Sequence, residues 1–164
     1  EIIESKANDR KSLKNTKKLA KLEKKAGEYK VSIGIENVWN KFLLSPLEIK
    51  KFLEDINSEY VGAYFDIGNV MYIGDPSDYI RILGKYIKKI HVSDYRVNQN
   101  GLGAFVDIFA GDVDFIEVMK EIKSIAYNDY LTLEMLPNYS RFPELSICSN
   151  KPAMDKLKAL YDAI

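Results

Sequence analysis

The chain has 164 residues, a length that fits one domain, and its 24 basic residues balance 24 acidic ones. Zero net charge gives no electrostatic case for a nucleic acid or an anionic membrane as a partner. No apolar run reaches the roughly 20 residues that span a bilayer, and no signal peptide is visible.

Cysteine and histidine each occur once. Cys148 excludes an internal disulfide and fits a reducing compartment, so we expect a cytoplasmic protein. Because Cys148 lies in the polar stretch SICSNKP, we interpret it as an inert thiol and not as a nucleophile. His91 lies in KYIKKIHVSDYR, where a short strand is predicted to end. Its role depends on the chemistry at the ends of the other strands.

Residues 8–25 carry leucines at helix-like intervals among lysines, which predicts an amphipathic helix that ends before Gly27. The next segment, VSIGIENV (31–38), is rich in β-branched residues and almost continuously apolar up to Glu36. This pattern predicts a strand that is buried on both faces, as in parallel sheets.

The stretch SPLEIKKFLEDI carries the signature of a helix start. Ser45 is the predicted N-cap, Pro46 takes the first helical position, and Glu48 follows three residues after the cap, as in a capping box. Apolar residues then recur on one face of the predicted helix: Ile49, Phe52, Leu53 and Ile56.

This strand-and-helix unit repeats three more times. A long loop is predicted at 96–112. We interpret its glycines in GLGAF as loop flexibility, because the strand–turn–helix context of a phosphate-binding loop is missing. The predicted strands cover 61–69, 86–94 and 130–136, and the predicted helices cover 76–86, 113–126 and 152–164.

Four strand–helix units in sequence imply an α/β fold with parallel strands joined by right-handed crossovers. Preceded by one helix, they predict the C-terminal half of a (β/α)8 TIM barrel. We expect residues 1–164 to form a single partial barrel domain. A doubly wound open sheet is the alternative, although the chain has no G-x-G-x-x-G fingerprint and no Walker A sequence.

Each predicted strand ends in a side chain that can bind metal. Catalytic groups of α/β proteins collect at these carboxyl ends, and a buried carboxylate is costly unless it is paired or metal-bound. Three carboxylates beside one imidazole suit a divalent cation, with Mn²⁺, Mg²⁺ or Co²⁺ favoured by the oxygen-rich set and Zn²⁺ left open. The four residues are Glu36, Asp66, His91 and Glu134.

Several runs of the chain occur together in an order that resembles a known family: GIENVWNKFLLSP, YVGAYFDIGNV, KKIHVSDY, GDVDFIEVMKEIKSIAYNDYLTLEM and PELSICSNKPAMDKL. They are similar to the C-terminal half of the sugar-phosphate isomerase/epimerase family, whose members have a xylose-isomerase-like TIM barrel. That family includes ketose 3-epimerases, L-ribulose- and L-xylulose-5-phosphate 3-epimerases and hexulose-6-phosphate isomerase-like proteins. The resemblance covers essentially residues 10–164.

The resemblance implies a metal set of Glu36, Asp66, His91 and Glu134. It also implies that Glu36 and Glu134 are the catalytic acid and base. The activity implied is a divalent-metal-dependent isomerase or epimerase of a ketose or ketose phosphate, with Mn²⁺ as the first choice of ion. One glutamate would remove a proton beside the carbonyl and the other would return one, through a metal-stabilised enediolate.

The chain departs from the ketose 3-epimerase branch in three ways. That branch usually has a histidine three residues after the aspartate ligand, where this chain has Asn69. An arginine follows the histidine ligand of that branch by six residues, whereas Arg96 follows by five. The first four βα units have no counterpart, so the resemblance implies a chain that begins in the loop between strand four and helix four.

Four residues are predicted to contact the sugar. Trp39 would form an apolar wall or pack in the interior, and Arg96 would meet a phosphate. Asn37 and Asn69 would donate hydrogen bonds to hydroxyls, or fix their own loops. The expected partners are a small sugar or sugar phosphate, and either a second copy of the chain or the missing N-terminal half.

Other functions stay open at this point. A hydrolase resembling endonuclease IV uses several histidines around zinc, and one histidine with zero net charge argues against it. Xylose isomerase proper uses a two-metal site with extra carboxylates, which we do not find. A dehydratase of inosose type uses a similar set of ligands. A non-catalytic half-barrel that self-associates through its open sheet edges is the alternative outside enzymology.

Overall fold

The computed structural model of the chain describes residue 19 and residues 21–98, 103–136 and 139–164. Four strands form one parallel sheet in the order β1-β2-β3-β6, so each strand lies beside the one that precedes it in this sheet. Their bounds are Ile33–Glu36 for β1, Val61–Asp66 for β2, Ile87–Val92 for β3 and Leu131–Leu133 for β6.

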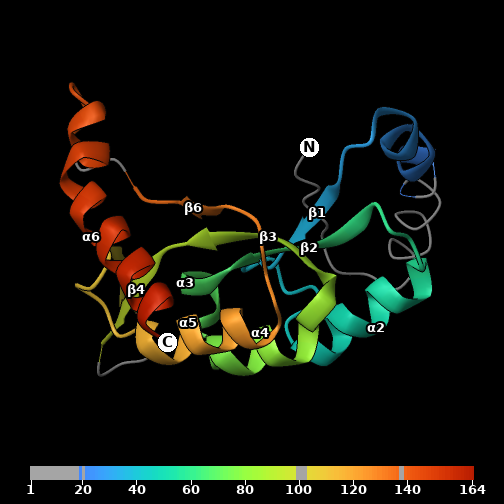
Figure 1. The fold of residues 1–164 in the computed structure, drawn as a ribbon, viewed down its shortest axis with the longest axis horizontal. Helices are drawn as coiled ribbons and strands as arrows, with labels where there is room; N and C mark the ends of the chain where they lie inside the picture. The colour runs from blue at the N-terminus through green and yellow to red at the C-terminus, as the bar shows by residue number, and fades with distance from the viewer. Residues whose placement is uncertain (1–18, 20, 99–102, 137–138) are drawn as a thin grey trace.

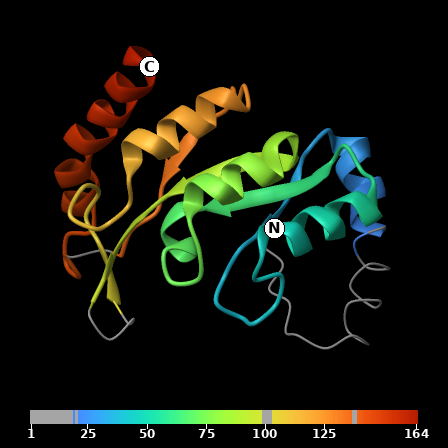
Figure 2. The same ribbon diagram turned by 90° about the horizontal axis from the view of Figure 1, so that it is seen from below.

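Helices α2, α4 and α5 lie on one face of this sheet, and α6 lies beside α5 (Figures 1 and 2). A doubly wound sheet would carry helices on both faces and would reverse its strand order. The structure therefore confirms the half-barrel prediction and excludes the doubly wound alternative. The bounds are Pro46–Ile56 for α2, Ile67–Val70 for the short α3, Pro76–Leu83 for α4, Phe115–Ser124 for α5 and Glu144–Ala163 for α6.

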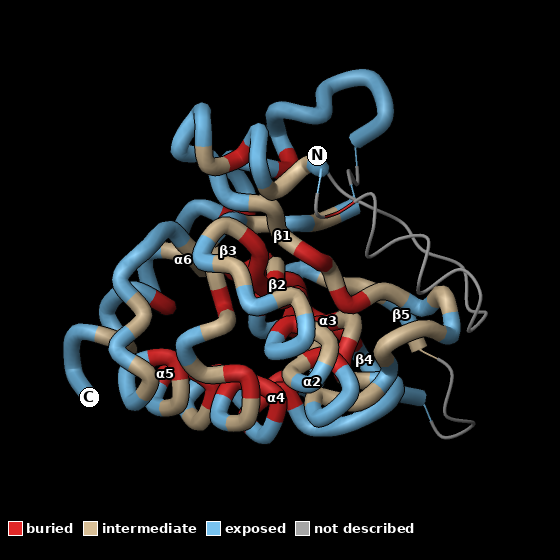
Figure 3. The backbone as a smooth tube through the Cα atoms, turned by 90° about the vertical axis from the view of Figure 1, so that its right-hand side faces the viewer, coloured by how far each residue is buried: buried red, intermediate tan, exposed pale blue. Residues whose placement is uncertain are grey.

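The core lies between the sheet and these helices, where the buried positions gather (Figure 3). Phe65 of β2 and Ile90 and Val92 of β3 are fully buried and belong to one cluster with Ile80 of α4. The prediction that β1 is buried on both faces is wrong, because β1 is an edge strand and only Ile35 of it is buried.

The capping box of α2 is confirmed. The backbone N–H of Glu48 donates to the Ser45 hydroxyl at 3.2 Å, and the backbone N–H of Ser45 donates to the Glu48 carboxylate at 3.2 Å. Asn57 ends the helix in the left-handed conformation. Of the predicted apolar face, Ile49 and Leu53 are buried.

The N-terminal helix does not end before Gly27, as predicted, but two residues after it. Lys30 adopts the left-handed conformation (φ 55°), and the N–H of Val31 donates to the carbonyl of Ala26 at 2.9 Å. This is a Schellman-type end in which lysine takes the position that glycine usually holds. The part of the predicted helix at 8–18 lies outside the described residues.

The segment predicted as a long loop contains an antiparallel ribbon of β4 (Asp94–Val97) and β5 (Gly103–Val106). Two strands of four residues are too short to show a clear alternation of apolar and polar side chains. The glycines of this segment therefore led to the prediction of a loop. Asp94 accepts backbone hydrogen bonds from Gly111 at 2.9 Å and Val113 at 3.3 Å, which fold the segment after the ribbon back onto it.

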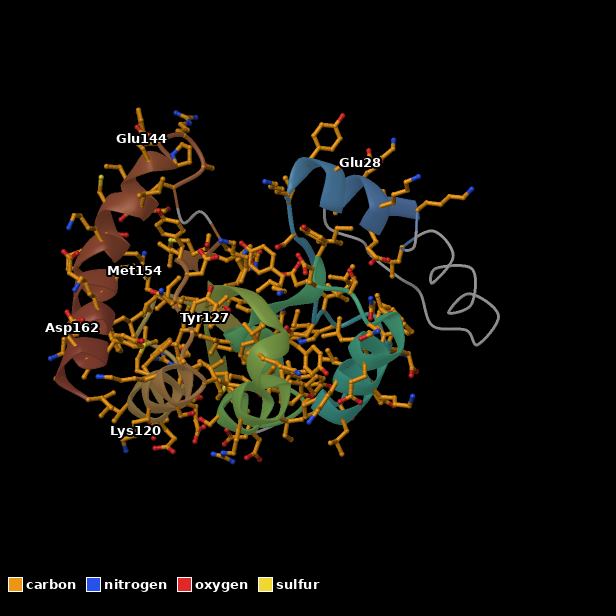
Figure 4. The ribbon with its side chains drawn as sticks, turned by 45° about the vertical axis from the view of Figure 1, so that its right-hand side comes forward. Glu28, Lys120, Tyr127, Glu144, Met154 and Asp162 are labelled. Carbon is orange, nitrogen blue, oxygen red and sulfur yellow. The ribbon has the colours of Figure 1, made fainter. Side chains whose placement is uncertain are left out.

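Helix α6 begins at Glu144, earlier than predicted, so Cys148 lies on an exposed helical turn and not in a polar loop. Pro152 misled the prediction because it usually marks a helix start. The turn before it is held by the buried Asn150, whose carboxamide oxygen accepts from the N–H of Ile108 at 3.3 Å. Figure 4 shows α6 standing next to α5. None of the helices in the described part of the chain is both long and apolar enough to cross a membrane.

Candidate metal centre

Four metal-competent side chains meet at the carboxyl ends of the four parallel strands. Glu36 ends β1, Asp66 ends β2, His91 lies near the end of β3 and Glu134 follows β6. The sheet register pairs Asp66 with His91, and the backbone N–H of Glu134 donates to the carbonyl of Val92 at 3.0 Å. One ligand atom from each of the four residues lies within 4.8 Å of the others. The structure thus brings together the whole predicted set.

His91 is the centre of this cluster. Its Nδ1 atom lies 2.5 Å from Glu134 Oε2, 3.1 Å from Glu36 Oε1 and 3.9 Å from Asp66 Oδ2. The ring of Tyr64 packs against the imidazole with centroids 3.9 Å apart. The side chains of His91, Glu36 and Asp66 are at most 11% exposed, whereas that of Glu134 is 51% exposed. Glu134 therefore forms the open side of the cluster.

Burial and the neighbouring carboxylates shift the pKa values of two residues of the cluster, Asp66 and His91. Burial raises the pKa of Asp66 to about 7, and the charge of Glu134 adds to this, although two hydrogen bonds act in the opposite direction. Burial lowers the pKa of His91, but its hydrogen bond with Glu36 and the surrounding carboxylate charges raise it overall. A divalent cation would offset this excess of negative charge, and carboxylates with an imidazole are ligands that such a cation accepts. The residues present therefore fit a metal ion.

The carboxamide of Asn37 is occupied by the main chain of the next strand. Its Nδ2 donates to the carbonyl of Asp66 at 2.9 Å, and its Oδ1 accepts from the N–H of Asp66 at 2.8 Å. Asn37 is buried, so it ties the end of β1 to the end of β2. Its contact with a sugar hydroxyl stays a prediction.

Trp39 and Asn69 lie next to each other beside the cluster. The indole N–H of Trp39 donates to the carbonyl of Asn69 at 2.8 Å, and its ring stacks on Phe105 with centroids 5.7 Å apart. Asn69 lines a cavity of about 160 Å³ that opens at the cluster. The sugar contacts of both residues stay predictions. The cavity is lined by Asp66, Asn69, Ser93, Phe105, Glu134, Met135 and Leu136.

Arg96 lies on the ribbon and does not line this cavity. Its guanidinium donates to the carbonyl of Ala110, and the residue is exposed. The contact of Arg96 with a phosphate stays a prediction.

Two residues of the site were not predicted from the sequence. Ser93 is buried and its hydroxyl donates to Asp66 Oδ1 at 2.9 Å. Phe105, in the segment interpreted as a flexible loop, forms an apolar wall of the cavity. The position of Ser93, two residues after His91, was the one available hint, because the side chains of a strand alternate between its faces.

Comparison with known proteins gives several matches. "Uncharacterized protein MJ1311" of Methanocaldococcus jannaschii is 29% identical over 126 residues, which are 73% of this chain and 42% of that protein. The crystal structure of the IOLI protein with a bound zinc atom matches 98% of this chain and 61% of its own length at 20% identity, with a TM-score of 0.80. A D-tagatose 3-epimerase-like protein matches 93% of this chain and 56% of its own length at 23% identity, with a TM-score of 0.72.

The chain spans less than two thirds of the length of each of these proteins. The structural similarities, at these identities, show the fold. The model of the xylose isomerase-like TIM barrel family matches residues 4–158, which is nearly the whole chain. The chain belongs to the xylose isomerase-like TIM barrel family.

Proposed function

We propose that this chain carries the metal centre of a divalent-metal-dependent isomerase or epimerase that acts on a ketose or ketose phosphate. One observation carries the proposal: two glutamates from the outermost strands of the sheet, Glu36 and Glu134, converge on the same imidazole as a buried aspartate. Mn²⁺ is the ion we propose. The IOLI structure, which has a similar fold, contains a bound zinc atom, and this supports metal binding by a chain of this fold without fixing the identity of the ion.

The roles of the two glutamates follow from their positions. When bound, the cation would polarise a substrate carbonyl and so acidify the neighbouring C–H. Glu36 ends β1 and Glu134 follows β6, at opposite ends of the strand order, so they approach a ligand from two sides. One takes the proton from carbon, and the other delivers a proton to the opposite face.

The cavity beside the cluster suits part of a sugar. Its polar wall holds Asn69 and Glu134, and its apolar wall holds Phe105 and Met135. Small-molecule sites commonly combine apolar walls with a few polar groups that fix orientation. In this proposal Trp39 backs the apolar wall through its stacking on Phe105, and a phosphate, if the substrate carries one, meets Arg96.

The parallel sheet has two edge strands, β1 and β6, to which a partner could add further strands. Because exposed strand edges pair readily, the proposal includes association with a second copy or with four further βα units. Sedimentation or light scattering of the chain tests this part. A monomer at all concentrations would contradict self-association.

Solvent exchange tests the activity directly. The chain is incubated with Mn²⁺ and xylulose 5-phosphate or ribulose 5-phosphate in D₂O, and deuterium at C3 and C1 is followed by NMR. Deuterium incorporation that requires Mn²⁺ is expected. Incorporation should fall about 10²- to 10⁴-fold in Glu134→Gln, the range typical of a lost acid–base group, and should be unchanged in Asp129→Asn, a carboxylate away from the cluster. No exchange under any of these conditions would contradict the proposed activity on these substrates.

A further inference from the structure

Asp66 is the most constrained carboxylate of the metal centre, and one buried serine accounts for much of the constraint. We infer that Ser93 is a positioning residue that occupies Oδ1 of Asp66 and thereby leaves Oδ2 as the one carboxylate oxygen available to a metal ion. The inference rests on the metal centre of the proposed function. It adds a residue that acts on the metal ion only through Asp66.

Two donors hold Oδ1 of Asp66. The backbone N–H of Asn69 donates to it at 2.6 Å, and the hydroxyl of Ser93 donates to it at 2.9 Å. A carboxylate oxygen has about two lone-pair sites, so Oδ1 is satisfied by these bonds. Oδ2 is the oxygen that faces Nδ1 of His91, at 3.9 Å. The carboxylate therefore has one occupied and one available oxygen.

The direction of the Ser93 hydroxyl is fixed by a third group. Its Oγ atom accepts a hydrogen bond from the N–H of Gly68 at 2.9 Å, so its proton points toward Asp66. Ser93 is 2% exposed, which leaves little room for water to compete for either bond. Gly68 has no side chain, and a Cβ there would lie 2.5 Å from the Ser93 Oγ atom. The glycine thus makes room for the serine.

The main chain of Asp66 is held as firmly as its carboxylate. Asn37 bonds to both its N–H and its carbonyl, so the Cα–Cβ bond of Asp66 has a fixed direction relative to β1. With the backbone fixed by Asn37 and Oδ1 fixed by Ser93, rotation of the carboxylate would break two buried hydrogen bonds. Such rotation is costly because buried groups without partners are destabilising.

Glu134 shows what a less constrained ligand looks like. Its side chain is 51% exposed, against 2% for Asp66, and its carboxylate contacts His91 from this open position. Partners outside the ligand set orient metal ligands, and their removal typically weakens metal binding about 10- to 100-fold. Ser93 is expected to have this effect through Asp66.

Cobalt binding tests the inference without relying on turnover. Co²⁺ is titrated into the chain, into Ser93→Ala and into the control Ser77→Ala, which alters another buried serine away from the cluster. We expect Co²⁺ affinity to fall about tenfold or more in Ser93→Ala alone. We also expect a weaker visible absorption per bound ion, because a freed carboxylate that binds through both oxygens raises the coordination number.

Gly68→Ala is the second variant, because it keeps the serine but displaces its hydroxyl. It should change the Co²⁺ spectrum in the same direction, and it decides the matter if Ser93→Ala does not fold. Unchanged affinity and spectrum in a folded variant would overturn the role of Ser93, as would a wild-type chain that binds no Co²⁺. A wild-type chain that binds Co²⁺ but exchanges no deuterium contradicts the proposed activity alone.

Discussion

The two ends of the parallel sheet use charged side chains in opposite ways. At the carboxyl end, the side chains of Glu36 and Asp66 are at most 8% exposed and lie around His91, with no lysine or arginine among the contacts described for them. Toward the amino end, Lys89 pairs with Asp129 at 2.6 Å, and both side chains are more than one third exposed. Like charges gathered away from water are costly, whereas unlike charges paired in water cost little. This contrast is the reason why we propose the metal centre at the carboxyl end of the sheet.

The largest effect is expected when His91, the one nitrogen donor among the four candidate ligands, is removed from the carboxyl end of the sheet. In His91→Ala, Mn²⁺ affinity should fall by more than the roughly 100-fold that loss of an outer partner can cause, because a direct ligand is lost. Isothermal titration calorimetry measures this. Lys89→Ala, two residues away on the same strand, is the matched control and should bind Mn²⁺ as the wild type does.

The pKa shifts predict opposite pH dependences for stability and for metal binding. The pKa values of Asp66 and His91 are raised in the folded chain, to about 7 for Asp66. The folded chain therefore binds more protons than the unfolded chain around neutral pH, and the metal-free chain should gain stability as the pH falls from 8 to 6. Mn²⁺ must displace those protons, so its affinity should fall over the same range.

Thermal unfolding with and without Mn²⁺ at several pH values measures both trends. In Asp66→Asn the gain in stability at low pH should be smaller, because one of the two groups no longer titrates. Stability of the metal-free wild type that rises from pH 6 to pH 8 would be the opposite of the expected result.

The smallest effect is expected when the exposed ion pair toward the amino end of the sheet is removed. Because the Lys89–Asp129 pair is solvent-exposed, its loss in Asp129→Asn should change the free energy of unfolding by less than about 1 kcal/mol. Urea denaturation measures this change. A loss of several kcal/mol would mean that this exposed pair contributes strongly to stability. It would contradict the view that the charged side chains at the amino end cost and contribute little.

The clustering of the four candidate ligands was predictable because it depends on strand order alone. Parallel strands bring their carboxyl ends together, so ionisable residues at the ends of four apolar runs were expected to meet there: Glu36, Asp66, His91 and Glu134. The capping box of α2 was predictable for a similar reason, since all of its groups lie within four residues of the chain.

The supporting residues were not predictable in the same way. Ser93 bonds to Asp66, 27 positions earlier in the sequence, and Asn37 bonds to the same residue from 29 positions before it. Neither pairing leaves a local pattern, because both depend on how adjacent strands align. Phe105 was missed because its strand is short and follows glycines, so the backbone pairing that places it has no periodic signal.

Mn²⁺ binding to the wild-type chain tests the central claim most directly. Electron paramagnetic resonance of free Mn²⁺ during a titration gives both the stoichiometry and the affinity. The structure predicts one ion per chain, with binding lost when Glu36 and His91 are replaced together by alanine. Absence of binding to the wild type, or equal binding to the double variant, would contradict the assignment of a metal centre to this end of the sheet.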